Sequence, residues 1–391
     1  LSSPFSKPVM MKRSDRQRSG LPPAISLYVH VPFCRSKCPY CAFYSFPPAV
    51  GDIPSFLQAL EKEIALLGRE GDLPRIRTAY IGGGTPSLLS VPDWRRLIRI
   101  LERAFTFIPG AEVTVEANPA SLTGGHLSLW KDWRVTRVSL GVQSLQDKDL
   151  LAAGRAHDRR LALDSMTRIS GTDLSLSVDL LFGLPGQHFR GWGETLREIL
   201  SEGVDHVSIY QLTLEEGTPW GERPPNDLAE GYPFYRWAQY YLEKKGLLQY
   251  EIASFARPGR WCRHNVSYWR GGEFIGLGPS AWGYRKYQRT RNIPDLPEYC
   301  SMVARGKSPV CYSERLEGDR LASESAILAL RTRWGIRLQD LRRDWGDDLP
   351  ERMAAALKEL PRDLFRRSPG RIALSRRGMR VGNSIWERLV P

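Results

Sequence analysis

LYVHVPFCRSKCPYCAFYSF, residues 27–46, is the stretch that decides the fold. Its apolar, β-branched start predicts a strand that ends at Val31, and three cysteines follow directly: Cys34, Cys38 and Cys41. The whole chain of 391 residues contains only six cysteines. So few cannot make a disulfide scaffold, and the placing of half of them in one loop therefore indicates a metal site.

Outward from this loop, short apolar or β-branched runs alternate with longer amphipathic ones. The strand-like runs are residues 25–31, 77–83, 112–117, 137–142, 174–183 and 206–212. Between them, segments such as residues 55–70 and 93–105 repeat apolar residues at the three- and four-residue spacing of a helix. Six strand–helix units predict an α/β fold with a parallel sheet, a partial (β/α)6 TIM-type barrel.

The composition divides the chain into three segments. Residues 1–24 are a basic extension that we expect to be disordered, and residues 25–300 form the barrel domain. Within it, the glycine- and aromatic-rich residues 214–300 predict a helix near residues 234–245, then loops and strands that close the open side of the barrel. Residues 313–391 are charged and helical and predict a small C-terminal α+β domain of helices and a hairpin.

The formal net charge of +13 lies mostly at the two ends of the chain. A solvated surface explains it most simply; the other explanation is an anionic partner, such as nucleic acid, a membrane surface or a propionate-bearing ligand. Without a nucleic-acid motif, no nucleic acid is expected. We expect a cytoplasmic protein, at most peripheral to a membrane, because no apolar run approaches the roughly 20 residues of a membrane span and the start has no signal-peptide core.

The spacing C-x-x-x-C-x-x-C leaves two kinds of metal centre to weigh. Tetrahedral zinc needs a fourth protein ligand, which His30 would have to provide, although a histidine in a strand is more often a core group. A [4Fe-4S] cluster held by three thiolates leaves one iron open to a small molecule. The cysteines follow the first strand, at the carboxyl-end rim where (β/α) barrels do their chemistry, and this context favours the cluster.

The flanking residues resemble one family in particular. The segments YVHVPFC (28–34), GGGTP (82–86), VEANP (115–119), SLGVQS (139–144) and DLLFGLP (179–185) are similar to those of the HemN/HemW family of radical S-adenosylmethionine (SAM) proteins. The resemblance runs from about residue 25 to the C-terminus. It implies a [4Fe-4S] cluster on the three cysteines and SAM on the open iron.

The family also implies which residues hold SAM. Gly83 and Gly84 would let the backbone approach the cofactor, and Thr85 would add a hydroxyl. The polar positions are Glu116, Gln143, Arg155 and Asp179, and further positions match by offset: Tyr28, Tyr40, Thr213 and Trp282. Trp282 stands where the HemW pattern often has histidine. Taken singly, each residue has an ordinary alternative, such as a tight turn for GGGTP.

Two features separate the branches of the family. The oxygen-independent coproporphyrinogen III oxidases carry a fourth cysteine that would fall on position 43, which is Phe43 here. The HemW branch, which resembles haem chaperones, lacks it and carries H-N-x-x-Y-W. This chain has His264, Asn265, Tyr268 and Trp269 in that pattern.

These four residues have two interpretations. His264 ligates haem iron while Tyr268 and Trp269 pack on the porphyrin, or His264 and Asn265 hydrogen-bond a turn while the aromatics fill core. Cys262 is another possible haem ligand. Cys300 and Cys311 have no motif around them and are expected to be buried free thiols.

The resemblance therefore implies a haem chaperone that binds haem as cargo and passes it to acceptor proteins, which include membrane-associated respiratory proteins, and that uses an electron donor. The alternative is a coproporphyrinogen III oxidase that decarboxylates propionates by radical chemistry. A third alternative is a regulatory or scaffold protein that holds zinc. Whether the chain cleaves SAM reductively, and so is an enzyme, is left open by the residues.

Overall fold

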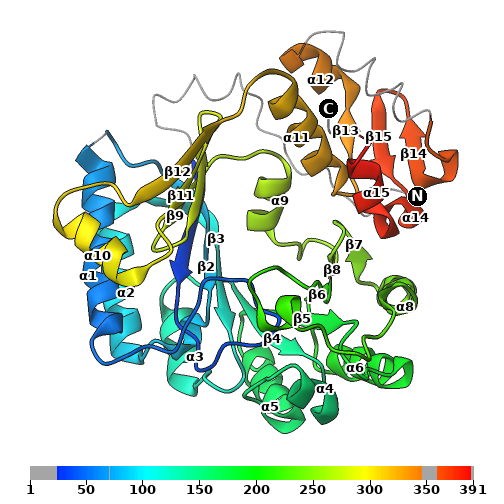
Figure 1. The fold of residues 1–391 in the computed structure, drawn as a ribbon, viewed down its shortest axis with the longest axis horizontal. Coiled ribbons are helices and arrows are strands. Elements are labelled where there is room, and N and C mark those ends of the chain that lie inside the picture. The colour runs from blue at the N-terminus through cyan, green and yellow to red at the C-terminus, as the bar shows by residue number, and fades with distance from the viewer. Residues whose placement is uncertain (1–23, 70, 346–358, 389–391) are drawn as a thin grey trace.

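The computed structural model describes residues 24–69, 71–345 and 359–388. Over these residues the β-structure forms one twelve-stranded and one three-stranded sheet (Figure 1). The extension expected at residues 1–24 lies outside the described residues, apart from Ala24.

The large sheet has the strand order β12-β11-β10-β9-β1-β2-β3-β4-β5-β6-β8-β7. Its strands are β1 (Ile25–Val31), β2 (Ile76–Gly83), β3 (Phe107–Ala117), β4 (Arg137–Gln143), β5 (Ser175–Phe182), β6 (His206–Gln211), β7 (Leu248–Gln249), β8 (Ser254–Ala256), β9 (Phe274–Leu277), β10 (Trp282–Arg285), β11 (Gln288–Asn292) and β12 (Val310–Arg315). Neighbours from β9 through β1 to β6 are parallel. The α/β fold and all six predicted strands are confirmed; β3 begins five residues earlier than expected.

Residues 214–300 extend the sheet instead of closing it. β9 adds to the free edge of β1 in parallel and β10, β11 and β12 follow antiparallel, while β8 and β7 add to the edge of β6. The strands at the two edges are therefore β12 and β7, and the barrel stays open between them.

Helices lie around the outside of this curved sheet (Figure 1). They are α1 (Asp52–Arg69), α2 (Val91–Ala104), α3 (Gly124–Asp132), α4 (Asp147–Ala152), α5 (Arg159–Ser170), α6 (Phe189–Ser201), α8 (Gly231–Lys244) and α10 (Leu296–Ala304). The short helices η2 (Pro86–Leu88) and α7 (Pro219–Glu222) follow β2 and β6, and Trp220 of α7 contacts Tyr40 of the cysteine loop. α2 shows how the sequence starts the outer helices: Ser90 and Asp93 form a reciprocal capping box. One short helix, α9 (Arg263–Trp269), contacts the inner face of the sheet instead, because His264 reaches Thr78 of β2.

The two faces of the strands differ in chemistry. On β1, Leu27 and Val29 are fully buried in the core shared with the outer helices, while Tyr28 and His30 point to the other face. On β3, Val113 alternates with residues such as Glu112 in the same way. The inner face of the sheet is therefore polar, although much of it is buried. A buried polar surface suits a ligand site rather than a hydrophobic core.

The C-terminal residues have a core of their own. α11 (Gly318–Leu330) packs on a small sheet of β13 (Ile336–Arg337), β15 (Arg371–Leu374) and β14 (Phe365–Ser368); the other elements are α12 (Leu338–Trp345), η3 (Arg362–Leu364), α14 (Arg376–Arg380) and α15 (Gly382–Trp386). The antiparallel β14–β15 pair is a hairpin. The large sheet itself runs on to Arg315 of β12, two residues beyond the start that we expected for the C-terminal domain.

A buried carboxylate ties the added strands to the outer helices. Glu63 of α1 accepts hydrogen bonds from Tyr299 OH of α10 (2.7 Å), the Gly278 amide after β9 (2.8 Å) and Asn292 Nδ2 of β11 (2.5 Å). Burial raises the pKa of this carboxyl to about 7. Removal of Glu63 leaves the Gly278 amide and Tyr299 OH without an acceptor, while Asn292 Nδ2 keeps only its second bond, to Gly278 O (2.9 Å).

We predict that Glu63→Ala lowers the free energy of unfolding by about 3 kcal/mol, since unpaired buried donors cost about 1–3 kcal/mol each and partial relaxation recovers some of that cost. Urea denaturation measures the change. Glu61→Ala, at an exposed position on the same helix, is the control and should leave stability within about 0.5 kcal/mol. Equal effects of the two variants would contradict this role for Glu63.

Candidate cofactor site

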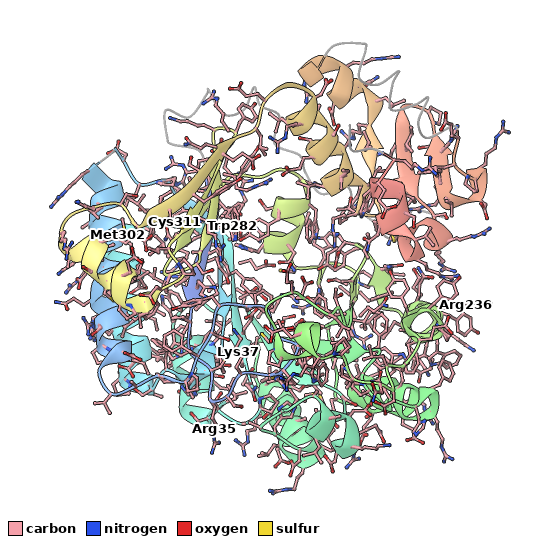
Figure 2. All side chains as sticks on the ribbon, in the orientation of Figure 1. Arg35, Lys37, Arg236, Trp282, Met302 and Cys311 are labelled. Atoms are coloured by element: carbon pink, nitrogen blue, oxygen red, sulfur yellow. The ribbon has the colours of Figure 1, made fainter. Side chains whose placement is uncertain are left out.

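The three cysteines lie on the loop between β1 and α1, and each is half-buried. Backbone bonds hold the base of the loop: the Cys34 amide donates to Phe46 O (3.0 Å), and the Cys41 amide donates to Cys38 O (3.1 Å). Phe33, just before Cys34, is fully buried. The loop is therefore anchored at its base, while the thiols stay accessible from the rim. Figure 2 labels Arg35 and Lys37 on this loop.

The described residues lack any group of three or more His, Cys, Asp and Glu side chains that could hold a single metal ion. His30 does not complete such a group: its Nδ1 lies 3.0 Å from Tyr28 OH and its Nε2 2.8 Å from Tyr44 O, and burial lowers its pKa to about 4. Three thiols without a fourth protein ligand are the donor set of a [4Fe-4S] cluster with an open iron, in which each thiolate binds a different iron. The residues present fit that group better than they fit zinc.

Polar groups of the neighbouring loops face the thiols. Thr85 Oγ1 lies 3.3 Å from Cys34 Sγ, and Arg155 Nη1 lies 3.5 Å from Cys38 Sγ. Arg155 also donates through Nη2 to Gly141 O (2.9 Å), but its buried Nε has no partner within the described structure. An unpaired buried donor at the rim is a group that a ligand can satisfy.

The glycines of GGGTP are required by packing within the protein. A Cβ on Gly84 would lie 2.6 Å from Phe33 O and 2.8 Å from Val31 O, and a Cβ on Gly83 would lie 2.5 Å from the His30 ring. Gly83 also has a φ of +105°, which favours glycine. The sequence suggested that these glycines make room for a cofactor; the structure gives them a second task, which is to seat the end of β2 against the cysteine loop.

Two half-buried carboxylates lie on the inner face: Glu116 near the carboxyl end of β3 and Asp179 in the middle of β5. Glu116 accepts from Tyr80 OH (2.8 Å) and the Gly83 amide (2.9 Å), and burial raises its pKa to about 7. Asp179 accepts from Ser139 Oγ (2.8 Å), and burial raises its pKa as well. Both acids are thus partly shielded from water beside the rim, where they could meet a cation such as an ammonium group.

Gln143 ends β4 in an unusual conformation. Its φ of +68° lies in the left-handed region that non-glycine residues seldom adopt, and the pairing register of β4 with β5 shifts between Gly141 and Gln143. Such strain often occurs at ligand sites. Of the remaining expected SAM residues, Tyr28 contacts His30 on the inner face, Tyr40 packs against Trp220, and Thr213 follows β6 with its Oγ1 3.4 Å from Gln211 O.

Trp282 lies elsewhere. It begins β10 and is 40% exposed, with Tyr312 of β12 as a ring neighbour (5.7 Å between centroids) and Arg291 of β11 stacked over it at 5.6 Å. In Figure 2 it appears near Cys311 and apart from Arg35 and Lys37 of the cysteine loop. The contacts of Trp282 are thus with the added strands β11 and β12 and not with the rim residues above.

The H-N-x-x-Y-W motif forms most of α9. Glu112 of β3 fixes the start of this helix by accepting from the amides of Arg263 (3.0 Å) and His264 (2.9 Å). Arg137 Nη2 lies 3.9 Å from the same carboxylate. This contact could not be predicted from the sequence, because Glu112 and His264 are 152 positions apart. The one available signal was a charged residue at an inner-face position of a strand.

His264 is almost fully buried, and both of its ring nitrogens have partners. Nδ1 lies 2.9 Å from Thr78 Oγ1 and Nε2 lies 2.7 Å from Tyr268 OH, and burial lowers the pKa of His264 to about 3. Iron could bind this histidine only after one of these hydrogen bonds is broken. The structure thus has the geometry of the second interpretation, in which the histidine hydrogen-bonds within the fold.

The rest of the motif divides between two sides. Tyr268 packs on Phe274 at 4.4 Å between centroids, whereas Trp269 faces Arg331 of the C-terminal part at 4.3 Å. Asn265 is half-buried on the first turn of α9.

The three cysteines outside the loop differ in exposure. Cys262 is buried with its Sγ 3.7 Å from Glu112 Oε1, and burial raises its pKa to about 12, so it is a poor ligand in this state. Cys300 is half-buried. Our expectation that Cys311 is buried was wrong: it is exposed, because β12 is the edge strand of the sheet.

Among the described helices, not one combines the length and the apolar character needed to cross a membrane.

Comparison with known proteins gives the family and the fold of the chain. Residues 28–199 match the model of the Radical SAM superfamily. The chain is 32% identical to the heme chaperone HemW of Mycobacterium tuberculosis over 98% of this chain and all of that protein, and 29% identical to the heme chaperone HemW of Bacillus subtilis over 92% and 98%. The solved structure of the radical SAM enzyme coproporphyrinogen III oxidase (HemN) from Escherichia coli has a TM-score of 0.83 at 21% identity, over 94% of this chain and 90% of that one. This last similarity shows the fold alone.

We predict that Gly84→Ala lowers the iron and sulfide that the chain retains after anaerobic reconstitution to less than about half, because the added methyl group displaces the cysteine loop from β2 and overpacking costs about 1–3 kcal/mol. Colorimetric iron and sulfide analysis measures this. Gly68→Ala is the control, since a Cβ there meets nothing within 4 Å. Full iron and sulfide in Gly84→Ala would contradict the seating role, and zinc without sulfide in the unaltered chain would exclude the cluster.

Proposed function

We propose that this chain, which belongs to the HemW family of the radical SAM superfamily, is a haem chaperone that binds haem and transfers it to acceptor proteins. The observation that carries the proposal is the similarity, over 98% of the chain, to a protein named heme chaperone HemW. Two local features support it. The cysteine loop has an exposed Phe43 in place of a fourth cysteine, and the H-N-x-x-Y-W motif forms an ordered helix on the inner face of the sheet.

In this proposal Cys34, Cys38 and Cys41 would hold a [4Fe-4S] cluster, and its open iron would be the place where SAM binds. When bound, the cluster supplies one-electron chemistry to SAM, with electrons from a donor protein. Arg155 places its Nη1 3.5 Å from Cys38 Sγ, and its buried, unpaired Nε is free for a ligand. Glu116 and Asp179 offer carboxylates to the amine and ribose groups of SAM, and the strained backbone at Gln143 holds that side chain at the rim.

The oxidase alternative has less support. The likeness to coproporphyrinogen III oxidase is at 21% identity and extends to the fold only. Phe43 is 65% exposed and its carbonyl accepts from Lys37 Nζ, so an ordinary surface residue occupies the position of the oxidase cysteine. The phenyl ring of Phe43 has no sulfur, so it cannot replace a thiol as a metal ligand or as a hydrogen donor.

The acceptors follow from the same family. We propose haem-binding proteins as acceptors, among them respiratory proteins at the membrane surface, with the chaperone working in the cytoplasm. The strongly basic chain, with a net charge of +13, is compatible with transient contact with an anionic surface.

We predict that SAM binding to the cluster-loaded chain strengthens as pH rises. Below its pKa of about 7, Glu116 is protonated, and above it the carboxylate is a stronger acceptor for the N–H groups of the SAM amine. The affinity should therefore rise by up to about tenfold from about pH 6 to pH 8 and then level off. Titration calorimetry measures it, with Glu116→Gln as the control that keeps the shape and loses the charge. A flat profile in the unaltered chain would remove Glu116 from SAM binding.

We predict that the anaerobically reconstituted chain binds haem and passes it to an apo-acceptor, and that it forms no protoporphyrinogen from coproporphyrinogen III with SAM and a reductant. Visible absorbance follows the haem titration, and chromatography of the porphyrins follows the oxidase assay. Clear formation of protoporphyrinogen, or the absence of any haem binding, would contradict the chaperone function.

A further inference from the structure

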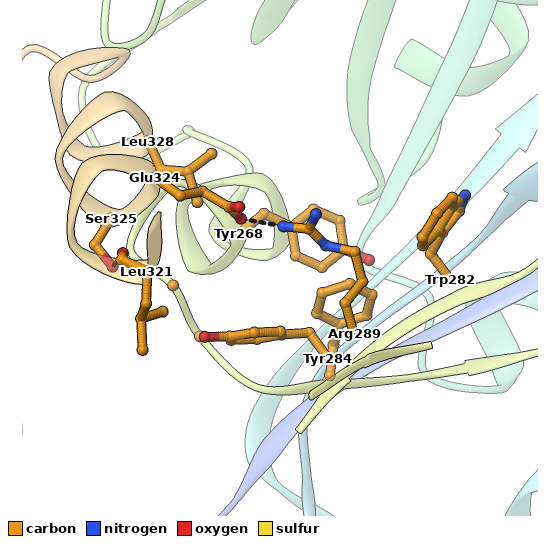
Figure 3. Close-up of a pocket in the computed structure, with 11 residues that line it drawn as sticks. Tyr268, Trp282, Tyr284, Arg289, Leu321, Glu324, Ser325 and Leu328 are labelled. Carbon is orange, nitrogen blue, oxygen red and sulfur yellow. Dashed lines mark hydrogen bonds and ion pairs between the residues drawn. The ribbon is translucent and has the colours of Figure 1, made fainter. Parts of the chain in front are cut away.

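A pocket of about 370 Å³ lies between the large sheet and the C-terminal helix α11 (Figure 3). The sheet side contributes β9, β10 and β11, and the end of α9 with its following turn closes one side. The lining residues are Tyr268, Gly271, Gly272, Phe274, Trp282, Tyr284, Arg289, Leu321, Glu324, Ser325 and Leu328. None of the rim residues assigned to SAM lies here except Trp282, so the pocket is separate from the cysteine loop.

The walls are flat and apolar. Tyr268, Phe274, Trp282 and Tyr284 present aromatic rings, and Leu321 and Leu328 face them from α11. Phe274 and Tyr284 lie 6.5 Å apart, and Phe274 and Tyr268 lie 4.4 Å apart, between ring centroids. Adjacent rings of this kind suit a planar, polarisable ligand, which they can contact face-on or by an edge.

Tyr268 connects this wall to the buried histidine. Its ring lines the pocket while its OH lies 2.7 Å from His264 Nε2, on the side away from α11 (Figure 3). His264 is therefore behind the wall, where it positions Tyr268. The motif histidine can thus influence a ligand in the pocket without touching it.

A cation spans the pocket. Arg289 of β11 pairs with Glu324 of α11, the interaction drawn in Figure 3, and its Nη1 lies 3.4 Å from Glu314 of β12. The side chains of Arg289 and Glu324 are 30% and 32% exposed. A planar guanidinium with this partial exposure can bind a carboxylate of a ligand in place of Glu324. It would donate two parallel N–H···O hydrogen bonds to that carboxylate.

We propose that this pocket is the binding site for the edge of a tetrapyrrole, with the macrocycle against Tyr268, Trp282 and Tyr284 and a propionate carboxylate on Arg289. The assignment rests on the proposed haem-chaperone function and adds the site and the group that recognises the cargo. The pocket provides both parts of the ligand's chemistry: a flat apolar slot and one accessible guanidinium.

The size of the pocket agrees with a cargo that must leave again. Pockets that bury most of a drug-sized ligand span about 300–1,000 Å³, and this one lies near the lower end. A whole macrocycle cannot be enclosed, so part of it stays at the open mouth. An acceptor protein can then contact the cargo before the chaperone releases it.

The test compares haem with haem dimethyl ester, which has the same macrocycle but no carboxylates. Visible absorbance titrations use the full chain and two variants that break the same ion pair: Arg289→Gln removes the cation, and Glu324→Gln keeps it. A third variant, Ser325→Trp, fills the pocket from α11. Circular dichroism and the cluster spectrum check that each variant is folded.

We expect the unaltered chain to bind haem about tenfold more tightly than the ester, because one charge-assisted contact is lost. Glu324→Gln should keep that preference, Arg289→Gln should reduce it to within about twofold, and Ser325→Trp should weaken both ligands about tenfold or more. If Ser325→Trp fails to fold, Leu328→Trp takes its place, and the Arg289→Gln comparison stands without either.

Three results would overturn the site. They are a full preference for haem in Arg289→Gln, equal loss of the preference in both ion-pair variants, and unchanged haem binding in a folded, pocket-filled variant. In all three cases the unaltered chain still binds haem, so the result contradicts the proposed site and leaves the chaperone function intact. An unaltered chain that binds no haem overturns the chaperone function together with the site.

Discussion

The close approach of the β2 end to the loop after β1 is the constraint on which the site depends. A side chain on Gly84 would meet the backbone of Val31 and Phe33 at less than 3 Å, so the cysteine loop can sit against the sheet only if position 84 is glycine. The amide of Gly84 uses this proximity and donates to Val31 O (2.8 Å). Thr85 is thereby brought to Cys34, and Gly83 to Glu116. One backbone contact thus sets the cysteines, the hydroxyl and the carboxylate in a fixed relation.

The polar inner face of the sheet connects the rim to α9. Glu116 and Glu112 lie on the same face of β3, two pleats apart, and one faces the rim while the other holds the start of α9. The cofactor rim and the H-N-x-x-Y-W helix are therefore mounted on a single rigid strand. Tyr80 of β2 joins the two sites directly, because its OH donates to Glu116 (2.8 Å) and its ring centroid lies 5.2 Å from that of His264. His264 in turn contacts Tyr268.

The sequence predicted what local pattern controls. Alternating strands of the barrel, the loop of three cysteines and the helix near residues 234–245 follow from periodicity, spacing and residue type. It could not predict contacts between distant segments. The capping of α9 by Glu112, the two partners of His264 and the pocket between β10 and α11 depend on tertiary packing. Cys311 was misjudged for the same reason: its exposure depends on β12 being an edge strand, which no motif near it shows.

The most direct measurement of the central claim is a structure of the chain with cluster, SAM and haem bound. We expect the cluster on Cys34, Cys38 and Cys41. We expect the macrocycle between Tyr268, Tyr284 and α11, with one of its carboxylates on Arg289. We also expect that His264 still contacts Tyr268 and Thr78. Haem iron bound directly to His264 within the inner face, with the pocket beside α11 empty, would contradict the claim.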